Sequence, residues 1–458
     1  MDIVIDFSGI PTENPIAFGW WFFKNIGWIY PVFLIVAGML ELWKNWLKTK
    51  YREARKYIVL AVDVPKNIEN GPQSVEHIFN QLSGAQQGIG RYEKWWTGEI
   101  PDSFSFELIS VGGYIQFMIH TCVQYRDLVE AIVYAQYPDA EIMEVQDYVN
   151  DYKKIRFPND EYELWGTELR LAKKEFYPIR TYPEFEHSTE GFKDSMAGLL
   201  EALTRIGPGE QIWVQLVITP ADNSWIESAK IEVKKLIGAK VEQKKTWADK
   251  VFDFPDSIIK TVSESIALGS GAEASKPAAK SDDPPSKIQH MSYGEKVVVE
   301  GVEKKISKIG FHTKIRLIYL AEKTVFNKVT PKIIMGGFKQ FNTLNMNSFK
   351  ADPKSKTGGM VFLKKNRSIA RKNKIIYRYK NRGHFLEPGV YGQILNCEEL
   401  ATIYHFPTLN VKAPMLKKSE AKKAEPPISL PIEVFRPVKL QENTSTVKAE
   451  PPTDLPIG

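Results

Sequence analysis

The chain has 458 residues, which is enough for two or three domains with terminal extensions. Its net charge of +6 is too mild to indicate nucleic-acid binding by itself. Its two cysteines, Cys122 and Cys397, exclude a disulfide framework and a cysteine-based metal site. Residues 1–18 have little periodicity, and we expect them to form an N-terminal tail outside the cytoplasm.

Residues 19–56 carry the strongest signal in the sequence. No charged residue lies between Lys24 and Glu41, and the residues between them are apolar around the full circumference of a helix. Aromatic side chains bracket this run, as expected for a segment whose ends lie at the two headgroup levels of a bilayer. The sequence therefore predicts a transmembrane helix in contact with the lipid bilayer, anchored by Trp20, Trp21, Ile26, Trp28, Phe33, Leu34, Ile35, Val36, Leu40 and Trp43.

This segment is short for a membrane crossing, and the basic residues after it indicate its orientation. The uncharged run is shorter than the ~20 residues of a spanning helix. A helix from Trp20 to Trp43 would measure about 36 Å and would cross a core of about 30 Å if Lys24 extended outward. A buried core helix and a helix lying in the membrane surface are the alternatives. Basic residues follow the run, which predicts one crossing of the cytoplasmic membrane with the N-terminus outside and the bulk of the chain inside.

Residues 57–155 read as a first globular domain of short strands and helices. Gly112-Gly113 separates two alternating runs and predicts a two-residue hairpin. The order β-α-β-β-α-β is that of a ferredoxin-like unit. The expected elements are strands at 57–65, 103–111, 114–122 and 140–148 and helices at 72–82 and 124–138.

Residues 156–410 predict a second ferredoxin-like unit, in which a helical pair replaces the central hairpin. Residues 265–288 are rich in Gly, Ala, Ser and Pro and predict a flexible linker within this insertion. Residues 411–458 repeat Pro, Lys and Glu and predict a disordered tail. The fold class is therefore α+β. The expected elements are strands at 163–174, 210–218, 312–321 and 374–380 and helices at 195–206, 223–238, 292–308 and 332–343.

The motifs of common enzyme classes do not occur in this sequence. It has no phosphate-binding loop of the G-x-x-x-x-G-K-[ST] type, no His-Glu-x-x-His pair and no Gly-x-Ser-x-Gly elbow. Its histidines are scattered without metal-ligand spacing. We therefore expect no catalytic residue, cofactor or metal, and no ATP hydrolysis by this polypeptide alone.

One segment, residues 364–382, is denser in basic residues than the overall composition predicts. Tyrosines are interleaved with its cations, which would suit a phosphate backbone with stacked bases. The same charges could instead contact anionic lipid, or form an ordinary solvated hairpin. The cations are Lys364, Lys365, Arg367, Arg371, Lys372, Lys374, Arg378, Lys380 and Arg382.

Four stretches together resemble a family of membrane-anchored bacterial proteins with a domain of unknown function, common in lineages with reduced genomes. They lie at 105–148, 160–182, 337–343 and 395–407, and "YAQYPDAEI" and "ELATIYHFP" are the most distinctive parts. In that family an equivalent region commonly stands in front of a HerA-like motor domain of the type IV secretion and conjugation ATPases. No motor follows the Pro-rich tail here, so we expect a motor encoded separately or a stand-alone relative.

The hypothesis that follows is a non-catalytic, single-pass membrane adaptor or scaffold. The resemblance implies a secretion or DNA-transfer ATPase as its partner. The alternative is a membrane-tethered nucleic-acid-binding protein that uses residues 364–382, and an enzyme with an unfamiliar site is the third. The sequence leaves the oligomeric state and the transported molecule open.

Overall fold

The computed structural model describes residues 20–21, 23–65, 70–85, 90, 92–186, 194–239, 291–358, 363–382 and 392–408. All of them lie in the first of two compact units, Met1–Lys422, the second being Lys423–Gly458. Three predictions fall outside the described residues: the N-terminal tail 1–18, the flexible linker 265–288 and the disordered tail 411–458.

The first long element is the helix α2, Ile29–Glu53. A π-helical turn, Phe23–Gly27, precedes it, so the predicted helix from Trp20 does not run as one continuous α-helix. Pro31 lies in the first turn of α2, where its missing N–H costs no helical hydrogen bond, and this explains the start. Among the helices of the described part, none combines the length and the apolar character required to cross a membrane. Residues 54–56 alone join α2 to the first strand.

The first half of the sheet matches the predicted elements. Val75, Ile78 and Phe79 are spaced along one side of a helix and are buried, with Pro72 at the helix start. Gly112 and Gly113 have φ of 56° and 92°, the positive values that a tight hairpin turn requires. The elements are β1 (Tyr57–Asp63), α3 (Pro72–Leu82), β2 (Phe104–Val111), β3 (Tyr114–Cys122), α4 (Arg126–Gln136) and β4 (Glu141–Val145).

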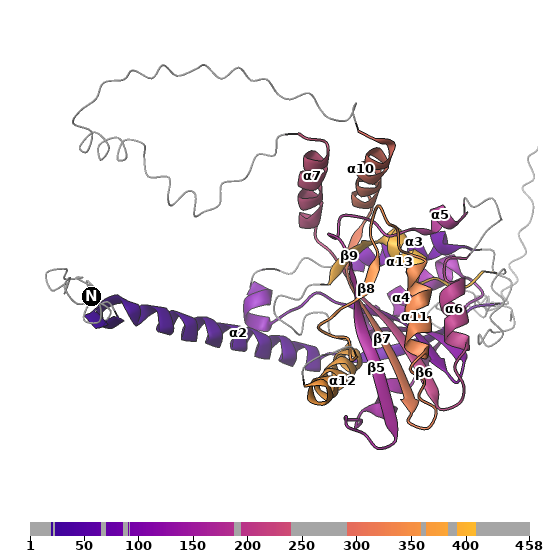
Figure 1. Ribbon diagram of the computed structural model, residues 1–458, viewed down its shortest axis with the longest axis horizontal. Helices are drawn as coiled ribbons and strands as arrows, with labels where there is room; N and C mark the ends of the chain where they lie inside the picture. Colours follow the sequence, from indigo (N-terminus) through magenta and orange to yellow (C-terminus); the bar gives the residue numbers. More distant parts are fainter. Residues whose placement is uncertain are drawn as a thin grey trace, which may run out of the picture. The chain divides into compact units, whose positions relative to one another are not determined.

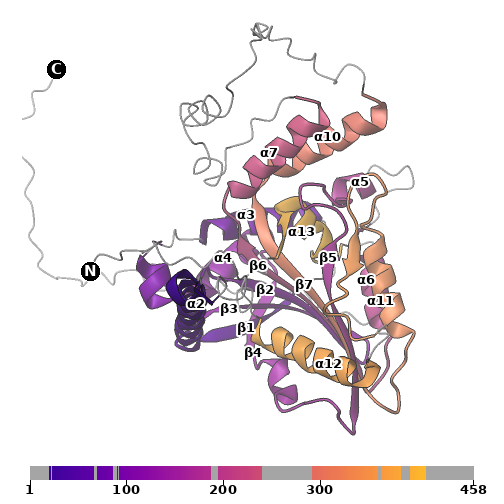
Figure 2. The ribbon, with the colours of Figure 1, turned by 60° about the vertical axis from the view of Figure 1, so that its left-hand side comes forward.

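The second half contains the predicted strands and helices up to residue 339, and its ending differs from the prediction. α7 and α10 pack against each other as the predicted helical pair between two strands (Figures 1 and 2). The elements are the short helix η5 (Tyr148–Tyr152), β5 (Tyr162–Leu171), α5 (Tyr182–Glu186), α6 (Ala197–Thr204), β6 (Glu210–Pro220), α7 (Ser224–Leu236), α10 (Tyr293–Ile306), β7 (Gly310–Glu322), α11 (Thr330–Lys339), β8 (Phe349–Ala351), α12 (Lys364–Asn381), β9 (Gln393–Asn396) and α13 (Cys397–Ile403).

The predicted closing strand at 374–380 is wrong, because these residues belong to α12. Ile375, Ile376 and Tyr379 are its buried residues, and Ile369 packs beside them. This spacing is that of one helix face, and the strict alternation of a half-buried strand is missing. β8 takes the position beside β5 instead, through the pairing of Phe349–Ala351 with Leu169–Leu171.

The strands of the described part form one nine-stranded antiparallel sheet in the order β4-β1-β3-β2-β6-β7-β5-β8, with β9 also paired to β7. Two separate sheets, as the sequence suggests, are therefore not formed. β2 pairs with β6 from Phe104–Ile218 to Val111–Gln211. Two separate four-stranded sheets would each leave such an apolar edge unpaired, and this pairing removes both edges.

The two faces of the sheet bury different side chains. On one face α3, α4, α6, α11 and α13 cover the larger core, to which Phe106, Leu216 and Leu317 contribute from neighbouring central strands. On the opposite face α12 and η5 cover a smaller core around Trp213 and Tyr379. Figure 2 shows α12 on the side of the sheet away from α6 and α11.

A row of four polar side chains crosses the sheet beneath α12, and we call it the polar row. Neighbouring members lie directly opposite one another. They are Glu107 on β2, Gln215 on β6, Arg316 on β7 and Glu168 on β5. Gln215 donates to Glu107 at 2.9 Å, and Arg316 donates to Gln215 at 2.8 Å and to Glu168 at 3.0 Å. α12 and the residue that follows it, Arg382, bind the two ends of the row. The contacts are Arg382 to Glu107 at 2.6 Å and Arg378 to Glu168 at 3.2 Å.

A buried ion pair also fixes α13 against α10, and it provides a stability test. Lys305 and Glu399 are fully buried, with Nζ and Oε2 2.9 Å apart. Lys305→Ala should lower the free energy of unfolding by about 3–5 kcal/mol, because it leaves the carboxylate of Glu399 buried without its cation. The measurement is urea unfolding of the purified chain followed by tryptophan fluorescence.

The neighbouring Lys304→Ala is the matched control. Lys304 is 54% exposed, and its partner Glu398 also binds Lys308. Its loss should cost less than about 1 kcal/mol. Equal losses for the two variants would contradict the assigned role of the buried pair.

Candidate functional site

The N-terminal half of α2 exposes apolar side chains on every side. Phe33, Leu34, Ile35 and Val36 are all exposed, Phe33 by 64%. Four consecutive residues at 100° intervals reach the whole circumference of a helix. Of the other predicted anchors, Trp20, Trp28, Leu40 and Trp43 are exposed, Trp21 is half-buried, and the side chain of Ile26 lies outside the described residues.

Sequence reasoning missed a second aromatic segment beside α2, the turn η3 (Glu93–Thr97). Trp96 is 65% exposed, and the Lys44 ammonium lies 4.1 Å from the ring centroid of Trp95. Gly98 has φ of 72°, and an added Cβ there would lie 2.5 Å from the Leu47 carbonyl carbon, so the segment lies directly against the helix. The pair of tryptophans in the polar stretch "YEKWWTGE" is the signal that could have indicated it.

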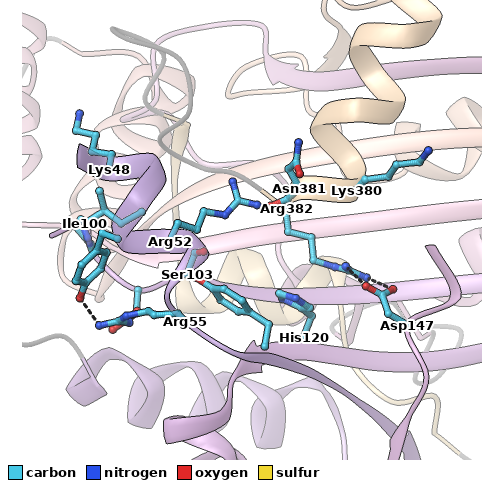
Figure 3. Close-up of a pocket in the computed structure, with 14 residues that line it drawn as sticks. Lys48, Arg52, Arg55, Ile100, Ser103, His120, Asp147, Lys380, Asn381 and Arg382 are labelled. Carbon is cyan, nitrogen blue, oxygen red and sulfur yellow. Dashed lines mark hydrogen bonds and ion pairs between the residues drawn. The ribbon is translucent and has the colours of Figure 1, made fainter. Parts of the chain in front are cut away.

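A cavity of about 200 Å³, which we call the junction cavity, lies where the end of α2 meets the sheet and the end of α12. Figure 3 shows Arg52 extending from α2 toward Asn381 and Arg382. The Arg52 guanidinium donates to the carbonyl of Asn381. The lining residues from α2 are Lys48, Tyr51 and Arg52, Arg55 follows just after the helix, and those from the sheet and loops include Ser103, His120 and Asp147.

Two of the arginines at this cavity are paired with acids. Arg55 binds Asp102 and the hydroxyl of Tyr51. Arg382 binds Asp147 through two hydrogen bonds, of 2.7 and 2.9 Å, in addition to its contacts with Glu107. Burial lowers the pKa of His120 well below its usual value, so its ring is neutral at pH 7.

Arg52 differs from these arginines. In the described part of the chain it forms no ion pair, and it donates a hydrogen bond to the main-chain carbonyl of Asn381. Burial lowers the pKa of Arg52 from its usual value, and the positive charges of Arg316 and Arg382 lower it further. This half-buried cation therefore lies beside a cavity without a compensating acid.

The structure separates the nine cations of residues 364–382 into two groups. Lys364, Lys365 and Arg367, at the start of α12, are exposed, and so is Lys374. The remaining cations bind acceptors within the protein. They are Arg371 to Lys356 O, Lys372 to Glu163, Arg378 to Glu168, Lys380 to Tyr152 O and Lys153 O, and Arg382 to Glu107 and Asp147.

The buried polar residues elsewhere act as structural partners. His405 contacts Asp194 at 2.9 Å and the carbonyl of Ala401 at 2.8 Å, so both ring nitrogens are used. Burial raises the pKa of the Cys397 thiol to about 12, which leaves it uncharged and a poor nucleophile. No three His, Cys, Asp or Glu side chains in the described ranges are arranged to hold a metal ion.

A family profile described as domain of unknown function DUF8128 matches residues 53–417. The chain belongs to the DUF8128 family. The DUF8128 region begins at Glu53, the last residue of α2, and includes the whole described sheet with α12 and α13. It includes Arg55, while Lys48 and Arg52 precede it. No curated protein is significantly similar to the chain.

The polar row gives a pH-dependent prediction. Burial alone would raise the pKa of Glu107, but Arg382 and the hydrogen bonds from Ser105 and Gln215 hold it below its usual value. The ionised carboxylate therefore stabilises the fold fully above the pKa of an unfolded glutamate, about 4.3, and this contribution is lost as pH falls through the lower folded-state pKa. Glu107→Gln should lower the free energy of unfolding at pH 7, and its deficit should shrink below about pH 4.3.

Urea unfolding across this pH range measures the effect. Glu141→Gln, at an exposed position on β4, is the control and should show no deficit. A deficit for Glu107→Gln that persists unchanged at the lowest pH would contradict an electrostatic origin.

Proposed function

We propose that the chain is a non-catalytic adaptor attached to a membrane through α2 and the residues before it. The observation that carries this proposal is the apolar surface around the whole N-terminal half of α2. Moving a large apolar side chain from water into lipid is favourable by about 1.5–3 kcal/mol. A helix that exposes such side chains on all sides is therefore unfavourable in water and favourable in lipid.

The aromatic and basic residues around the C-terminal half of α2 suit a membrane surface. Trp43 and Trp46 lie on α2 with ring centroids 5.4 Å apart, and Trp95 and Trp96 extend the aromatic group from η3. Tryptophan favours the headgroup level, and lysine and arginine favour the cytoplasmic side. The cations after the apolar run therefore support an orientation with the sheet in the cytoplasm. They are Lys44, Lys48, Lys50, Arg52, Arg55 and Lys56.

We infer that the sheet consists of two ferredoxin-like units joined edge to edge. The strand orders β4-β1-β3-β2 and β8-β5-β7-β6 support this, because each reads fourth, first, third, second along its own half. The helical pair α7 and α10 replaces the hairpin between the second and third strands of the second unit. The proposal gives these units the task of binding a partner, for which the sequence resemblance suggests a secretion or DNA-transfer ATPase.

Membrane attachment is tested with Leu34→Lys combined with Ile35→Lys. Each lysine in the apolar centre of a membrane segment costs about 2.5–3.5 kcal/mol, so the double variant should be released by a carbonate wash that leaves the original protein in the pellet. Leu344→Lys is the control, because Leu344 is 97% exposed on the globular part. Release of the original protein by carbonate would overturn the proposal.

The same membranes distinguish a crossing segment from one that lies in the surface. A crossing requires Trp20–Trp28 to extend α2 across the core, which would place an N-terminal tag inside sealed inside-out vesicles. Protease added to those vesicles should then digest the sheet and spare the tag. Cleavage of both would indicate a segment in one leaflet, and survival of the sheet would contradict the orientation.

Nucleic-acid binding is the second candidate, and one groove favours it. This groove, of about 780 Å³, runs beside β5 and α12. Its cations outnumber its acids, Glu168, Glu175 and Asp352. They are Arg170, Lys173, Lys174, Lys314, Lys354, Lys374 and Arg378.

Exposed cations of this groove separate the two candidates. Replacing Lys173, Lys354 and Lys374 by Gln should leave DNA retention and its salt dependence unchanged if the chain is an adaptor. A nucleic-acid-binding protein would lose about 0.9 in salt slope for each phosphate contact. Gln replacements of Lys328, Lys332 and Lys339, on and before α11, are the matched control. Co-purification of an ATPase with the detergent-extracted chain tests the adaptor directly, and repeated failure would count against it.

A further inference from the structure

We propose that the junction cavity binds a phosphate group that carries a small polar substituent, such as the headgroup of an anionic phospholipid or a free glycerol phosphate. The cavity lies at the end of α2 that the proposed function places next to the membrane, so the lipid form of this inference rests on that function. The phosphate chemistry itself rests on the residues that line the cavity.

The charges at the cavity favour an anion. Arg55 is balanced by Asp102, and Arg382 is balanced by Asp147 and Glu107. Lys380 also lines the cavity, but its ammonium donates to the carbonyls of Tyr152 and Lys153. This leaves Lys48 and Arg52 as lining cations that have no acidic partner in the described part of the chain.

The neutral lining groups are hydrogen-bond donors of the kind that bind phosphate oxygens. Ser103 and Asn381 line the cavity, and neither side chain has a hydrogen-bond partner among the described residues. Guanidinium, ammonium, hydroxyl and amide groups together match the several oxygens of one phosphate. Figure 3 shows Arg52 and Asn381 on the same side of the cavity, next to Arg382.

The size and position of the cavity restrict the ligand further. Pockets for larger small molecules measure about 300–1,000 Å³, so a cavity of about 200 Å³ suits a phosphate with a few attached atoms better than a nucleotide. Arg52 follows Trp46 by six residues on α2, a rise of about 9 Å. Headgroup layers are roughly 5–8 Å thick, so a lipid phosphate near the level of Trp46 comes within reach of the Lys48 and Arg52 side chains.

The test compares Arg52→Gln with Lys50→Gln in the full chain. Lys50 is exposed on the same helix, contacts the ring of Trp46 and does not line the cavity. In a neutral detergent, glycerol phosphate is titrated and its affinity is measured by calorimetry. In a second arm, nanodiscs of phosphatidylcholine with or without phosphatidylglycerol are compared by the melting temperature of the globular part.

Arg52→Gln should weaken glycerol phosphate binding by about tenfold or more in affinity, because a charge-assisted contact is lost. In nanodiscs it should abolish the stabilisation by phosphatidylglycerol. Lys50→Gln should leave both unchanged. A response in the detergent arm indicates free phosphate as a source, and a response confined to nanodiscs indicates a lipid. Lys48→Gln, which leaves the Arg52–Asn381 contact intact, provides a second variant and should weaken binding in the same arm.

Indistinguishable behaviour of Arg52→Gln and Lys50→Gln in both arms would overturn the proposal, and so would an absence of saturable binding by the original protein. Carbonate extraction of the same variants keeps the two proposals apart, because Arg52→Gln should stay membrane-attached. If the original protein washes off membranes but still binds glycerol phosphate in detergent, the cavity assignment stands and the membrane proposal fails.

Discussion

The polar row beneath α12 is the interaction on which the arrangement of the second face depends. It runs through Glu107, Gln215, Arg316 and Glu168 and crosses the boundary between the two halves of the sheet. A charged row inside a sheet is unfavourable unless every member has a partner. Arg378 of α12 and Arg382 directly after it supply the missing cations at the two ends, so the helix, the row and the β2–β6 pairing depend on one another. The smaller core around Trp213 then closes beside them.

This interaction explains why the basic segment was hard to interpret from sequence. A dense run of lysine and arginine usually indicates a solvated or ligand-binding surface, and at least five of these cations instead bind acceptors within the described part of the fold. Most of their partners are distant in sequence: Arg382 and Glu107 are 275 positions apart. No local pattern records such a pairing. The helical spacing of Ile375, Ile376 and Tyr379 was the available signal, and the tyrosines and isoleucines made the same segment resemble a strand.

Local patterns succeeded where the interactions that set the structure are local. The positive φ of Gly112 and Gly113 and the apolar spacing of α3 are properties of a few adjacent residues, and the predicted elements agree with the structure there. The joining of the two halves depends on which strand edges meet, which hydrophobic alternation does not specify. The aromatic turn at Trp95 and Trp96 and the junction cavity were missed for a related reason. Both arise from contacts between α2 and segments that follow it by tens of residues or more.

The connection between α2 and β1 has a mechanical consequence. Residues 54–56 are too few to act as a flexible linker, and Arg55 among them is bound to Asp102 and Tyr51. Arg52 reaches across to the end of α12 at the same level. Rotation or tilting of α2 therefore moves the strands with it, because the connection between them cannot absorb the motion. The orientation of α2 in its surroundings thus determines which edge and which face of the sheet another molecule meets.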